Sequence, residues 1–454
     1  MQTKKSLLLA AVICASAILI VAGCAAGGSS NEFKPPVQAE TPAPTETPKT
    51  ETKPAGESPM PASIETLVAA NNEFGFDLFN QLRTQDKDKN LFVSPLSVAT
   101  ALAMTYNGAV GDTHLAMKRA LKYGTMNHAD INQSSSALMT KLKSSDPKIE
   151  LQIANSLWAR QGVQFNPAFL DRNRQFFGAE VAALDFASPQ AVKTINGWVN
   201  QNTKGKIPAI IEQIDGNIVM YLINAVYFKG QWQNKFDAAR TQPQPFHLAD
   251  GKTKQTPLMA QSGSYQYFKG ENFQAVSLPY GQGGAALYLF LPNEGVSLSS
   301  WLGGLSFQNW QQWMTSFRNA QGDVKLPRFK MDYSRELNNA LTALGMGVAF
   351  DRSKANFSGI REQKDLFISQ VKHKAVLEVN EEGSEAAAAT SVAIGMTSVR
   401  REPERFSFIA DRPFLLAIRD QQTGAILFLG AVFVVSGLIL LSIINKLWAD
   451  SSEA

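Results

Sequence analysis

Side chains able to bind metals or act as nucleophiles are few and scattered in this sequence. The four histidines stand singly along the chain: His114, His128, His247 and His373. Both cysteines, Cys14 and Cys24, lie near the N-terminus, which leaves the body of the chain without a disulfide or a Cys-rich zinc site. No Gly-x-Ser-x-Gly, His-Glu-x-x-His, Walker or Gly-x-Gly-x-x-Gly motif occurs. We therefore expect neither a metal nor another cofactor, and no common hydrolase or nucleotide enzyme.

The most informative spacing lies in residues 380–398 (NEEGSEAAAATSVAIGMTS). Taken alone, residues 385–389 are good helix formers, and a short surface helix would explain them. Yet the whole segment resembles the hinge and reactive-centre loop of the serpins. That loop carries Glu-Glu-Gly-Ser/Thr, an acidic residue, a run of alanines and then threonine.

Other stretches also resemble serpin landmarks, in the family's order. They are residues 90–97 (NLFVSPLS), 195–207 (INGWVNQNTKGKI), 224–232 (NAVYFKGQW), 326–329 (LPRF), 373–377 (HKAVL), 411–414 (DRPF) and 424–430 (GAILFLG). The resemblance extends from residue 64 to residue 434, and several of its motifs are long. A chance match is therefore remote.

The resemblance implies an α+β fold with three β-sheets, about eight or nine helices and an exposed reactive-centre loop. It also implies an inhibitor rather than an enzyme. A serine protease, or alternatively a cysteine protease, would cleave the loop and form an acyl-enzyme. The cleaved loop would then insert as a new strand into the central sheet and trap the protease in a covalent 1:1 complex. The free inhibitor is expected to be a monomer.

The resemblance assigns the hinge to ten residues: Glu381, Glu382, Gly383, Ser384, Glu385, Ala386, Ala387, Ala388, Ala389 and Thr390. The residue pattern supports insertion independently, because alternate residues of a strand share one face. Even positions from 384 to 394 are first small and then β-branched, and all suit the buried face of a sheet. Gly383 suits a backbone that must change conformation.

Two further groups of residues match positions that control opening of the central sheet. The family's central polar cluster corresponds to Ser94, Ser97, Asn224 and His373. The region where the loop first inserts corresponds to Trp232, Arg328 and Glu381. For His373 alone, an ordinary hydrogen-bonded core histidine is the alternative. For the Arg328–Glu381 pair, the alternative is a solvated surface ion pair of small energetic value.

The bond that the protease would cleave has three candidate positions. Counting from Gly383 as in the family places it at Thr397–Ser398, and cleavage after Met396 is one residue away. Either position predicts an elastase-like or subtilisin-like target. Cleavage after Arg400 would instead predict a trypsin-like target and a longer insert. We favour Thr397–Ser398.

The N-terminus carries a different chemistry. Lys4 and Lys5 precede an uncharged, mostly apolar run over residues 6–23, as in a secretory signal peptide. The run ends in Val-Ala-Gly-Cys24, which resembles a bacterial lipoprotein signal whose cysteine thiol accepts the lipid. Cys24 would anchor the mature protein to a membrane, outside the cytoplasm on the extracellular or periplasmic face of the cell envelope. An ordinary membrane span or a chance cysteine is the alternative.

The chain divides into four parts by composition. Residues 1–23 form the signal, 24–61 a disordered tether rich in Pro, Thr and Glu, 62–435 the serpin-like domain and 436–454 a hydrophobic tail. Residues 425–444 are uncharged over a length that would span a membrane, but the resemblance requires 425–434 to be a core strand. The remainder is too short to span, so we expect it to pack on the body or touch the bilayer.

The elements that position these residues follow from apolar periodicity. Helices are expected over residues 64–82 and 96–117, strands over 148–154, 218–228, 329–333 and 366–379, a hairpin over 276–280 and 285–291, and a solvated loop over 86–90. The strand at 218–228 is apolar on both faces and is expected to be buried on both. A formal charge of +4 gives no reason to expect nucleic-acid binding.

Overall fold

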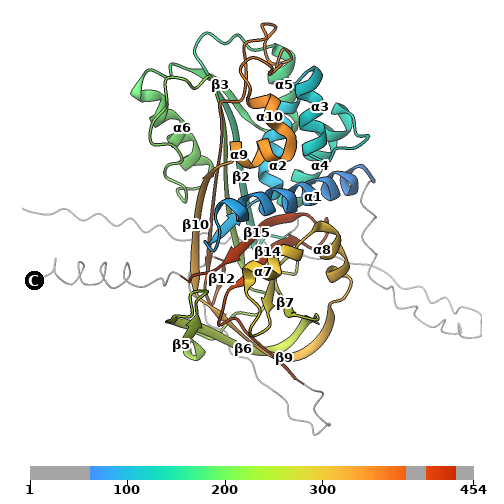
Figure 1. Cartoon of the computed structure of the whole chain (residues 1–454), viewed down its shortest axis with the longest axis vertical. Coiled ribbons are helices and arrows are strands. Elements are labelled where there is room, and N and C mark those ends of the chain that lie inside the picture. Colours follow the sequence, from blue (N-terminus) through green and yellow to red (C-terminus); the bar gives the residue numbers. More distant parts are fainter. Residues whose placement is uncertain (1–61, 145, 385–404, 436–454) are drawn as a thin grey trace, which may run out of the picture. The chain divides into compact units, whose positions relative to one another are not determined.

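The computed structural model describes residues 62–144, 146–384 and 405–435, which form two β-sheets and a set of surrounding helices (Figure 1). The helices are α1 Ala62–Gln85, α2 Pro95–Tyr106, α3 Gly111–Ala120, α4 His128–Ser144, α5 Pro167–Phe177, α6 Pro189–Asn202, α7 Leu298–Trp301, α8 Phe307–Met314, α9 Asn338–Leu341 and α10 Gly347–Phe350, with short turns η1 Ala238–Arg240, η2 Leu302–Gly304 and η3 Thr342–Met346. The strands are β1 Leu91–Val93, β2 Ile149–Arg160, β3 Glu180–Leu184, β4 Met220–Gln231, β5 Gln242–His247, β6 Thr253–Lys269, β7 Phe273–Tyr280, β8 Ala285–Pro292, β9 Arg318–Pro327, β10 Phe329–Glu336, β11 Gln370–Val379, β12 Gly383–Ser384, β13 Phe406–Ile409, β14 Phe414–Asp420 and β15 Ile426–Val432.

A six-stranded sheet runs in the order β10-β11-β4-β2-β3, with the short β12 also paired to β4. Its two central strands, β11 and β4, are parallel, whereas each has an antiparallel neighbour on its other side. Leu222 and Val226 of β4 belong to the main core, while Ile223 and Ala225 belong to a second core that includes α6. Strand β4 is therefore buried on both faces, as its continuous apolar run predicted.

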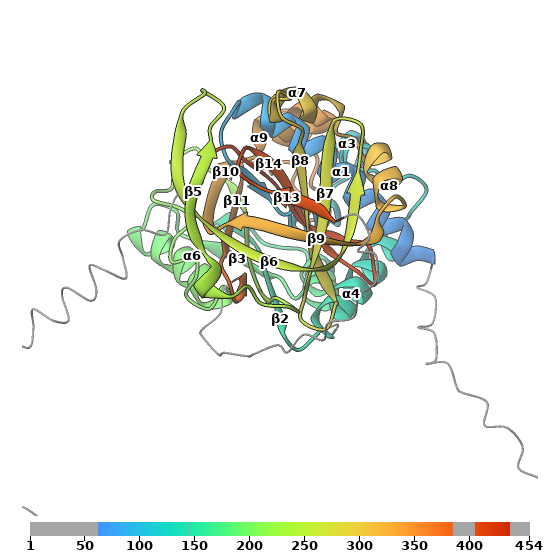
Figure 2. The same ribbon diagram turned by 90° about the horizontal axis from the view of Figure 1, so that it is seen from below.

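A nine-stranded sheet follows the order β1-β15-β14-β8-β7-β6-β9-β13, with β5 beside β6. Strand β6 has 17 residues, and it pairs in turn with β5, β9 and β7 along its length. Figure 2 shows β6 running along β9, with β5 on one side and β7 on the other. Two of the three expected sheets are thus joined into one by this long strand, which keeps the hydrogen bonding continuous.

The described residues contain nine α-helical segments, because α9, η3 and α10 follow one another and are interrupted only at Gly345 (φ 96°). All residues of α2 are buried. This helix begins at Pro95, which suits a first helical position, and Ser94 caps it through its side chain. The helices and mixed sheets confirm the α+β class.

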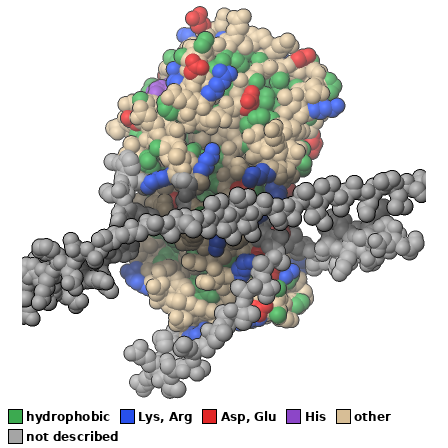
Figure 3. Space-filling model, turned by 180° about the vertical axis from the view of Figure 1, so that it is seen from behind, with side chains coloured by type: hydrophobic (Ala, Val, Ile, Leu, Met, Phe, Trp, Pro, Cys, Tyr) green, Lys and Arg blue, Asp and Glu red, His purple; other side chains and the backbone are tan. Residues whose placement is uncertain are grey.

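Most expected elements appear where the sequence placed them. Residues 96–117 form two helices, α2 and α3, and the predicted hairpin is the antiparallel pair β7 and β8. Residues 426–432 form the buried strand β15. On the face seen in Figure 3, Lys and Arg side chains are scattered among Asp and Glu. Across the part of the chain that the structure describes, the helices are too short or too polar to cross a membrane.

Candidate functional site

The seam between β4 and β11 is closed by a parallel ladder from Gln370 to Val376 of β11. We call this part the lower half of the seam, and the part beyond Val376 its upper half or top. The paired residues run from Gln370 opposite Tyr221 to Val376 opposite Tyr227. Both strands continue beyond this point without pairing to each other. On the outer side of the seam, β11 stays paired with β10 as far as Val379, so the two central strands separate while the rest of the sheet is intact.

The gap at the top of the seam is filled by the first residues of the hinge. After β11 the chain turns at Glu381 and Glu382, and two backbone hydrogen bonds between Asn380 and Gly383, of 2.9 and 3.3 Å, close this turn. The chain then returns as β12 and pairs antiparallel with β4. A strand of the reverse direction has therefore already begun between the two parallel strands.

The residues of β12 fit this position closely. Gly383 has a φ of 147°, and a Cβ added there would lie 2.1 Å from the carbonyl oxygen of Gly230. Only glycine can therefore occupy the position without displacing β4. Ser384 is fully buried, and its Oγ lies 2.7 Å from the hydroxyl of Tyr280. The ring of Tyr280 stacks on Trp232 with centroids 4.4 Å apart. Ser384 thus faces the sheet interior, as the alternation from position 384 predicted.

An ion pair holds the turn at Glu381. The Nε of Arg328 donates hydrogen bonds of 2.7 Å to both carboxylate oxygens, and the hydroxyl of Thr241 donates to the same carboxylate. The Glu381 side chain is 9% exposed and the Arg328 side chain 35%. Burial raises the pKa of Glu381, but the hydrogen bonds from Arg328 and Thr241 outweigh it and hold that pKa below its usual value. The carboxylate is therefore charged at neutral pH.

Side-chain and backbone contacts from the segment after β4 complete this region. The indole Nε1 of Trp232 donates to the carbonyl of Asn380 at 2.8 Å, and its backbone N–H donates to the carbonyl of Glu382 at 2.9 Å. Lys235 forms an ion pair with Glu382. We call Trp232, Thr241, Tyr280, Arg328, Glu381 and Ser384 the hinge site. It brings together the predicted Trp232, Arg328 and Glu381.

The four residues of the central polar cluster meet beneath the seam, at the start of α2. Asn224 and His373 stand opposite each other in the parallel ladder, and the amide of Asn224 donates to the hydroxyl of Ser97. The backbone N–H of Ser94 donates to Nε2 of His373 at 3.3 Å, and the Ser94 hydroxyl accepts from the backbone N–H of Ser97. All four side chains are fully buried. The cluster thus ties both central strands to one helix terminus.

His373 is neutral in this environment. Its Nδ1 lies 2.5 Å from Oδ1 of Asn224, while Nε2 accepts from the Ser94 backbone. This arrangement requires the proton on Nδ1 and leaves no acceptor for a second proton. Burial lowers the pKa of His373 to about 3. The Nδ1–H donated to Asn224 crosses the seam directly, so the strands cannot separate without breaking it.

Sequence reasoning missed three contributors to these networks. Asn155 of β2 stands opposite Asn224 and accepts from its amide at 2.5 Å. Tyr280 and Thr241 reach Ser384 and Glu381 from distant parts of the chain. Strand β2 also contains Glu150, Gln152 and Ser156, so nothing in its sequence marked out Asn155. For Tyr280 and Thr241, nothing in the local sequence marks the contact.

Several predicted residues lie outside the described residues. They are the remainder of the hinge (Glu385, Ala386, Ala387, Ala388, Ala389 and Thr390), the candidate cleavage positions Met396, Thr397, Ser398 and Arg400, and Cys24. Their roles stay predictions. In residues 62–144, 146–384 and 405–435, no group of three or more His, Cys, Asp or Glu side chains is placed to hold a metal ion.

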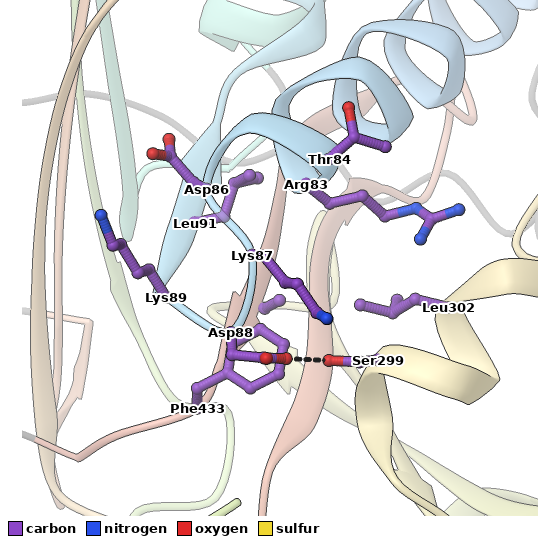
Figure 4. Close-up of a pocket in the computed structure, with 11 residues that line it drawn as sticks. Arg83, Thr84, Asp86, Lys87, Asp88, Lys89, Leu91, Ser299, Leu302 and Phe433 are labelled. Carbon is purple, nitrogen blue, oxygen red and sulfur yellow. Dashed lines mark hydrogen bonds between the residues drawn. The ribbon is translucent and has the colours of Figure 1, made fainter.

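A cavity of about 280 Å³ lies beside the end of α1, away from the predicted residues. Figure 4 shows Lys87 pointing toward Ser299 and Leu302, and Asp88 hydrogen-bonded to Ser299. Phe433 and Leu302 give it apolar walls. None of the hinge-site or central-polar-cluster residues lines this cavity.

The loop over residues 86–90 is less solvated than expected. Asp86 is only 8% exposed, accepts a hydrogen bond of 3.1 Å from the Tyr333 hydroxyl and lies 3.3 Å from Arg335. Both partners belong to β10, which is why the sequence around residue 86 gave no sign of them.

Comparison with known proteins gives a consistent result. The family model described as serpin (serine protease inhibitor) matches residues 69–435. The leukocyte elastase inhibitor of Bos taurus is 37% identical over 379 residues, covering 81% of this chain and 99% of the relative.

Solved structures agree with this relationship. The thermophilic serpin tengpin in its native state has a TM-score of 0.76 and 30% identity, covering 85% of this chain and 98% of its own. Human thyroxine-binding globulin, in complex with its ligand, has a TM-score of 0.75 and 29% identity, covering 83% of this chain and 100% of its own.

Proposed function

Because this chain belongs to the serpin family of serine protease inhibitors, we propose that it traps its target as a covalent 1:1 complex. Cleavage within the reactive-centre loop, which follows Ser384 in the chain, would free the hinge to continue as a strand between β4 and β11. An elastase-like or subtilisin-like serine protease, attached to the cleaved loop as an acyl-enzyme, would move with it. The bond attacked is Thr397–Ser398 in this proposal, with cleavage after Met396 or Arg400 as the alternatives.

The observation that supports this mechanism is the position of β12. Gly383 and Ser384 pair antiparallel with β4 at the top of a seam that is parallel below. A strand extended from Ser384 would replace one parallel pairing with two antiparallel ones, and would satisfy the same backbone groups with better geometry. Full insertion from Glu381 to Thr397 would carry the protease about 56 Å at ~3.3 Å per residue.

The hinge site and the central polar cluster have separate roles in this proposal. Arg328, Trp232 and Glu381 hold the first turn of the hinge in place before cleavage. Ser94, Ser97, Asn224 and His373 resist separation of β4 and β11. An inhibitor needs both, because a seam that opens before cleavage would take up the intact loop and lose its activity.

The elastase-like target is supported by the loop sequence and by a relative. Thr397 and Met396 are medium-sized, uncharged residues of the kind that such proteases accept before the cleaved bond. The relative from Bos taurus is named for inhibition of leukocyte elastase. A ligand-binding rather than inhibitory function, as the name thyroxine-binding globulin states for another relative, has no support in the hinge, since Ser384 is small and already lies in the sheet.

The test is incubation of the purified protein with elastase, subtilisin and trypsin, followed by denaturing gels. With elastase or subtilisin we expect a band at the mass of the protease plus that of the inhibitor without its released C-terminal fragment. Mass spectrometry of the released C-terminal peptide identifies the cleaved bond. A protease whose catalytic serine has been blocked serves as the control and gives no such band. Complete cleavage without a stable complex for all three proteases would contradict the mechanism.

We also propose that lipid on Cys24 attaches the inhibitor to a membrane of the cell envelope, outside the cytoplasm. Each buried CH₂ of such a chain contributes ~0.8 kcal/mol to membrane binding. Cys24→Ser should release the protein from membranes and leave protease inhibition unchanged. Truncation after Val435 is the companion variant, because residues 436–454 contain a second apolar stretch. Membrane retention that survives Cys24→Ser and disappears on truncation would make the C-terminus the anchor.

A further inference from the structure

A second cavity, of about 560 Å³, lies between the β6–β7 turn and helices α7 and α8. None of the hinge-site residues lines it. Trp301 ends α7 and Trp313 lies near the end of α8. Their rings stack with centroids 5.4 Å apart and an interplanar angle of 20°. Both side chains are partly exposed. Two stacked indoles from separate helices therefore line the cavity, and we call the part of this pair that is open to solvent the aromatic surface.

This aromatic surface is held rigidly from below. Phe273 is 6% exposed, and its ring centroid lies 5.1 Å from Trp301 and 5.0 Å from Trp313. Phe290, fully buried, contacts both indoles as well. Neither indole can turn away without disturbing the core, so the surface is formed before any ligand arrives.

Uncharged and acidic polar groups surround the aromatic surface. The lining adds amides and one carboxylate from Asn272, Asn309, Gln312 and Glu271. The amide nitrogen of Asn309 donates to the carbonyl of Gly304 at 2.7 Å, which fixes that side chain and turns its oxygen away from this bond. No Lys or Arg is among the residues that line the cavity.

This combination selects among ligand classes. A phosphate, sulfate or carboxylate ligand would meet Glu271 and no opposing cation, so anionic ligands are disfavoured. A quaternary ammonium group is bound by aromatic rings that stand around it as walls, whereas Trp301 and Trp313 lie nearly parallel and stacked. Amides and a carboxylate beside an aromatic surface suit a ligand with one apolar face and many hydroxyl groups at its edge.

We propose that the cavity between α7, α8 and the β6–β7 turn binds a neutral oligosaccharide. The C–H face of a pyranose ring would lie on the solvent-exposed part of the stacked Trp301–Trp313 pair, and its hydroxyls would hydrogen-bond to Asn272, Gln312 and Glu271. The cavity is large enough for more than one sugar ring. The hinge site does not contribute to it, so such an inhibitor would bind a glycan surface and a protease independently.

The test uses the full chain and three neutral hexasaccharides, chitohexaose, cellohexaose and maltohexaose, measured by isothermal titration calorimetry and by tryptophan fluorescence. We expect saturable 1:1 binding of at least one of them. Trp301→Ala and Asn272→Ala should each weaken it about tenfold or more. Asn272 is exposed on the turn, so this variant keeps the fold if the tryptophan variant does not.

The control is Trp198→Ala on α6, a partly exposed tryptophan that pairs with Trp158 on the other side of the six-stranded sheet. It should leave sugar binding unchanged. Unaltered covalent trapping of protease in all three variants would show that each is folded. Absence of binding to all three sugars, binding unaffected by Trp301→Ala and Asn272→Ala, or tighter binding of tetramethylammonium or of a sulfated hexasaccharide would each overturn the proposal.

Discussion

The upper and lower halves of the seam between β4 and β11 are closed by different physical means. At the top, the strands are already apart, and the hinge site holds β12 between them through an ion pair that is partly accessible to solvent. Below, the strands are hydrogen-bonded to each other, and fully buried neutral groups link Asn224 to His373. In the mechanism proposed above, insertion would therefore start without a large barrier and would be resisted lower down. Each variant below acts on one half and should leave the other half intact.

The largest effect is expected for Ser384→Arg, in the upper half. The serine is fully buried against Tyr280, and burying an unpaired guanidinium in its place costs several kcal/mol. Strand β12 should leave the sheet, insertion should stall and the protease should complete hydrolysis. We expect the yield of covalent complex with elastase or subtilisin to fall at least about tenfold, with cleaved inhibitor in its place.

Ser407→Arg is the matched control, because Ser407 is the exposed residue of β13 and the variant adds the same charge at a solvated position. It should trap protease normally. Equal complex yields for the two variants would show that Ser384 need not stay in the sheet.

The next largest effect is expected for Asn224→Ala, in the lower half. This change leaves Nδ1–H of His373 and the oxygen of Asn155 buried without their partner, at about 1–3 kcal/mol for each unpaired group. The midpoint of thermal unfolding should fall by several degrees. Prolonged incubation at moderate temperature should also convert more of the uncleaved protein to an inactive inserted form, visible as loss of trapping capacity over time. A variant with normal melting and a normal inactivation rate would place the resistance elsewhere.

Mild acid should weaken the lower half alone. The pKa of His373 is about 3 in the folded protein and 6.5 for the unperturbed group, so the unfolded chain takes up a proton first. The contribution of His373 to stability is complete above pH 6.5 and is lost as the pH falls toward 3, at ~1.4 kcal/mol per pH unit. The pKa of Glu381 lies below its usual 4.5, so this carboxylate stays charged, and its ion pair with Arg328 stays intact, at pH 4.5 and above.

Thermal unfolding between pH 7 and 5 measures this effect. We expect the midpoint to fall with pH in the wild type and less steeply in His373→Gln. Burial also lowers the pKa of His114, which contributes in the same direction, so His114→Gln is the parallel control. Identical pH profiles for wild type and His373→Gln would remove His373 as the acid-sensitive group.

The smallest effect is expected for Arg328→Gln, in the upper half. The arginine is about one-third exposed, so loss of its bond to Glu381 should lower stability by only about 1 kcal/mol. Insertion into the seam after cleavage should be slightly slower, because the turn that holds β12 in its starting position in the sheet is held less firmly. Stopped-flow measurement of trapping, at low and at high salt, tests this. A larger loss of stability in Arg328→Gln than in Asn224→Ala would reverse the order of effects proposed for the two halves of the seam.

Much of the fold and part of the site could be predicted from the sequence. The runs at 218–228 and 276–291 fall on β4 and on the β7–β8 hairpin because strand patterning is local. The resemblance marked Asn224 and His373, and the structure brings them within 2.5 Å. The number of separate sheets was not predictable in this way. It depends on how β6 pairs with three other strands along its length.

The sequence by itself determined that positions 384–394 alternate between residues fit for a buried face and residues fit for solvent, since that pattern is a property of consecutive residues. Only the tertiary structure decided that Ser384 stands beside Gly230 and against Tyr280, that Asn155 joins Asn224, and that the seam is parallel below and already occupied above. These contacts join residues from 69 to 154 positions apart, with Ser384 and Tyr280 separated by 104. Strand register and order across such distances follow from the packing of the whole sheet, which no local pattern specifies.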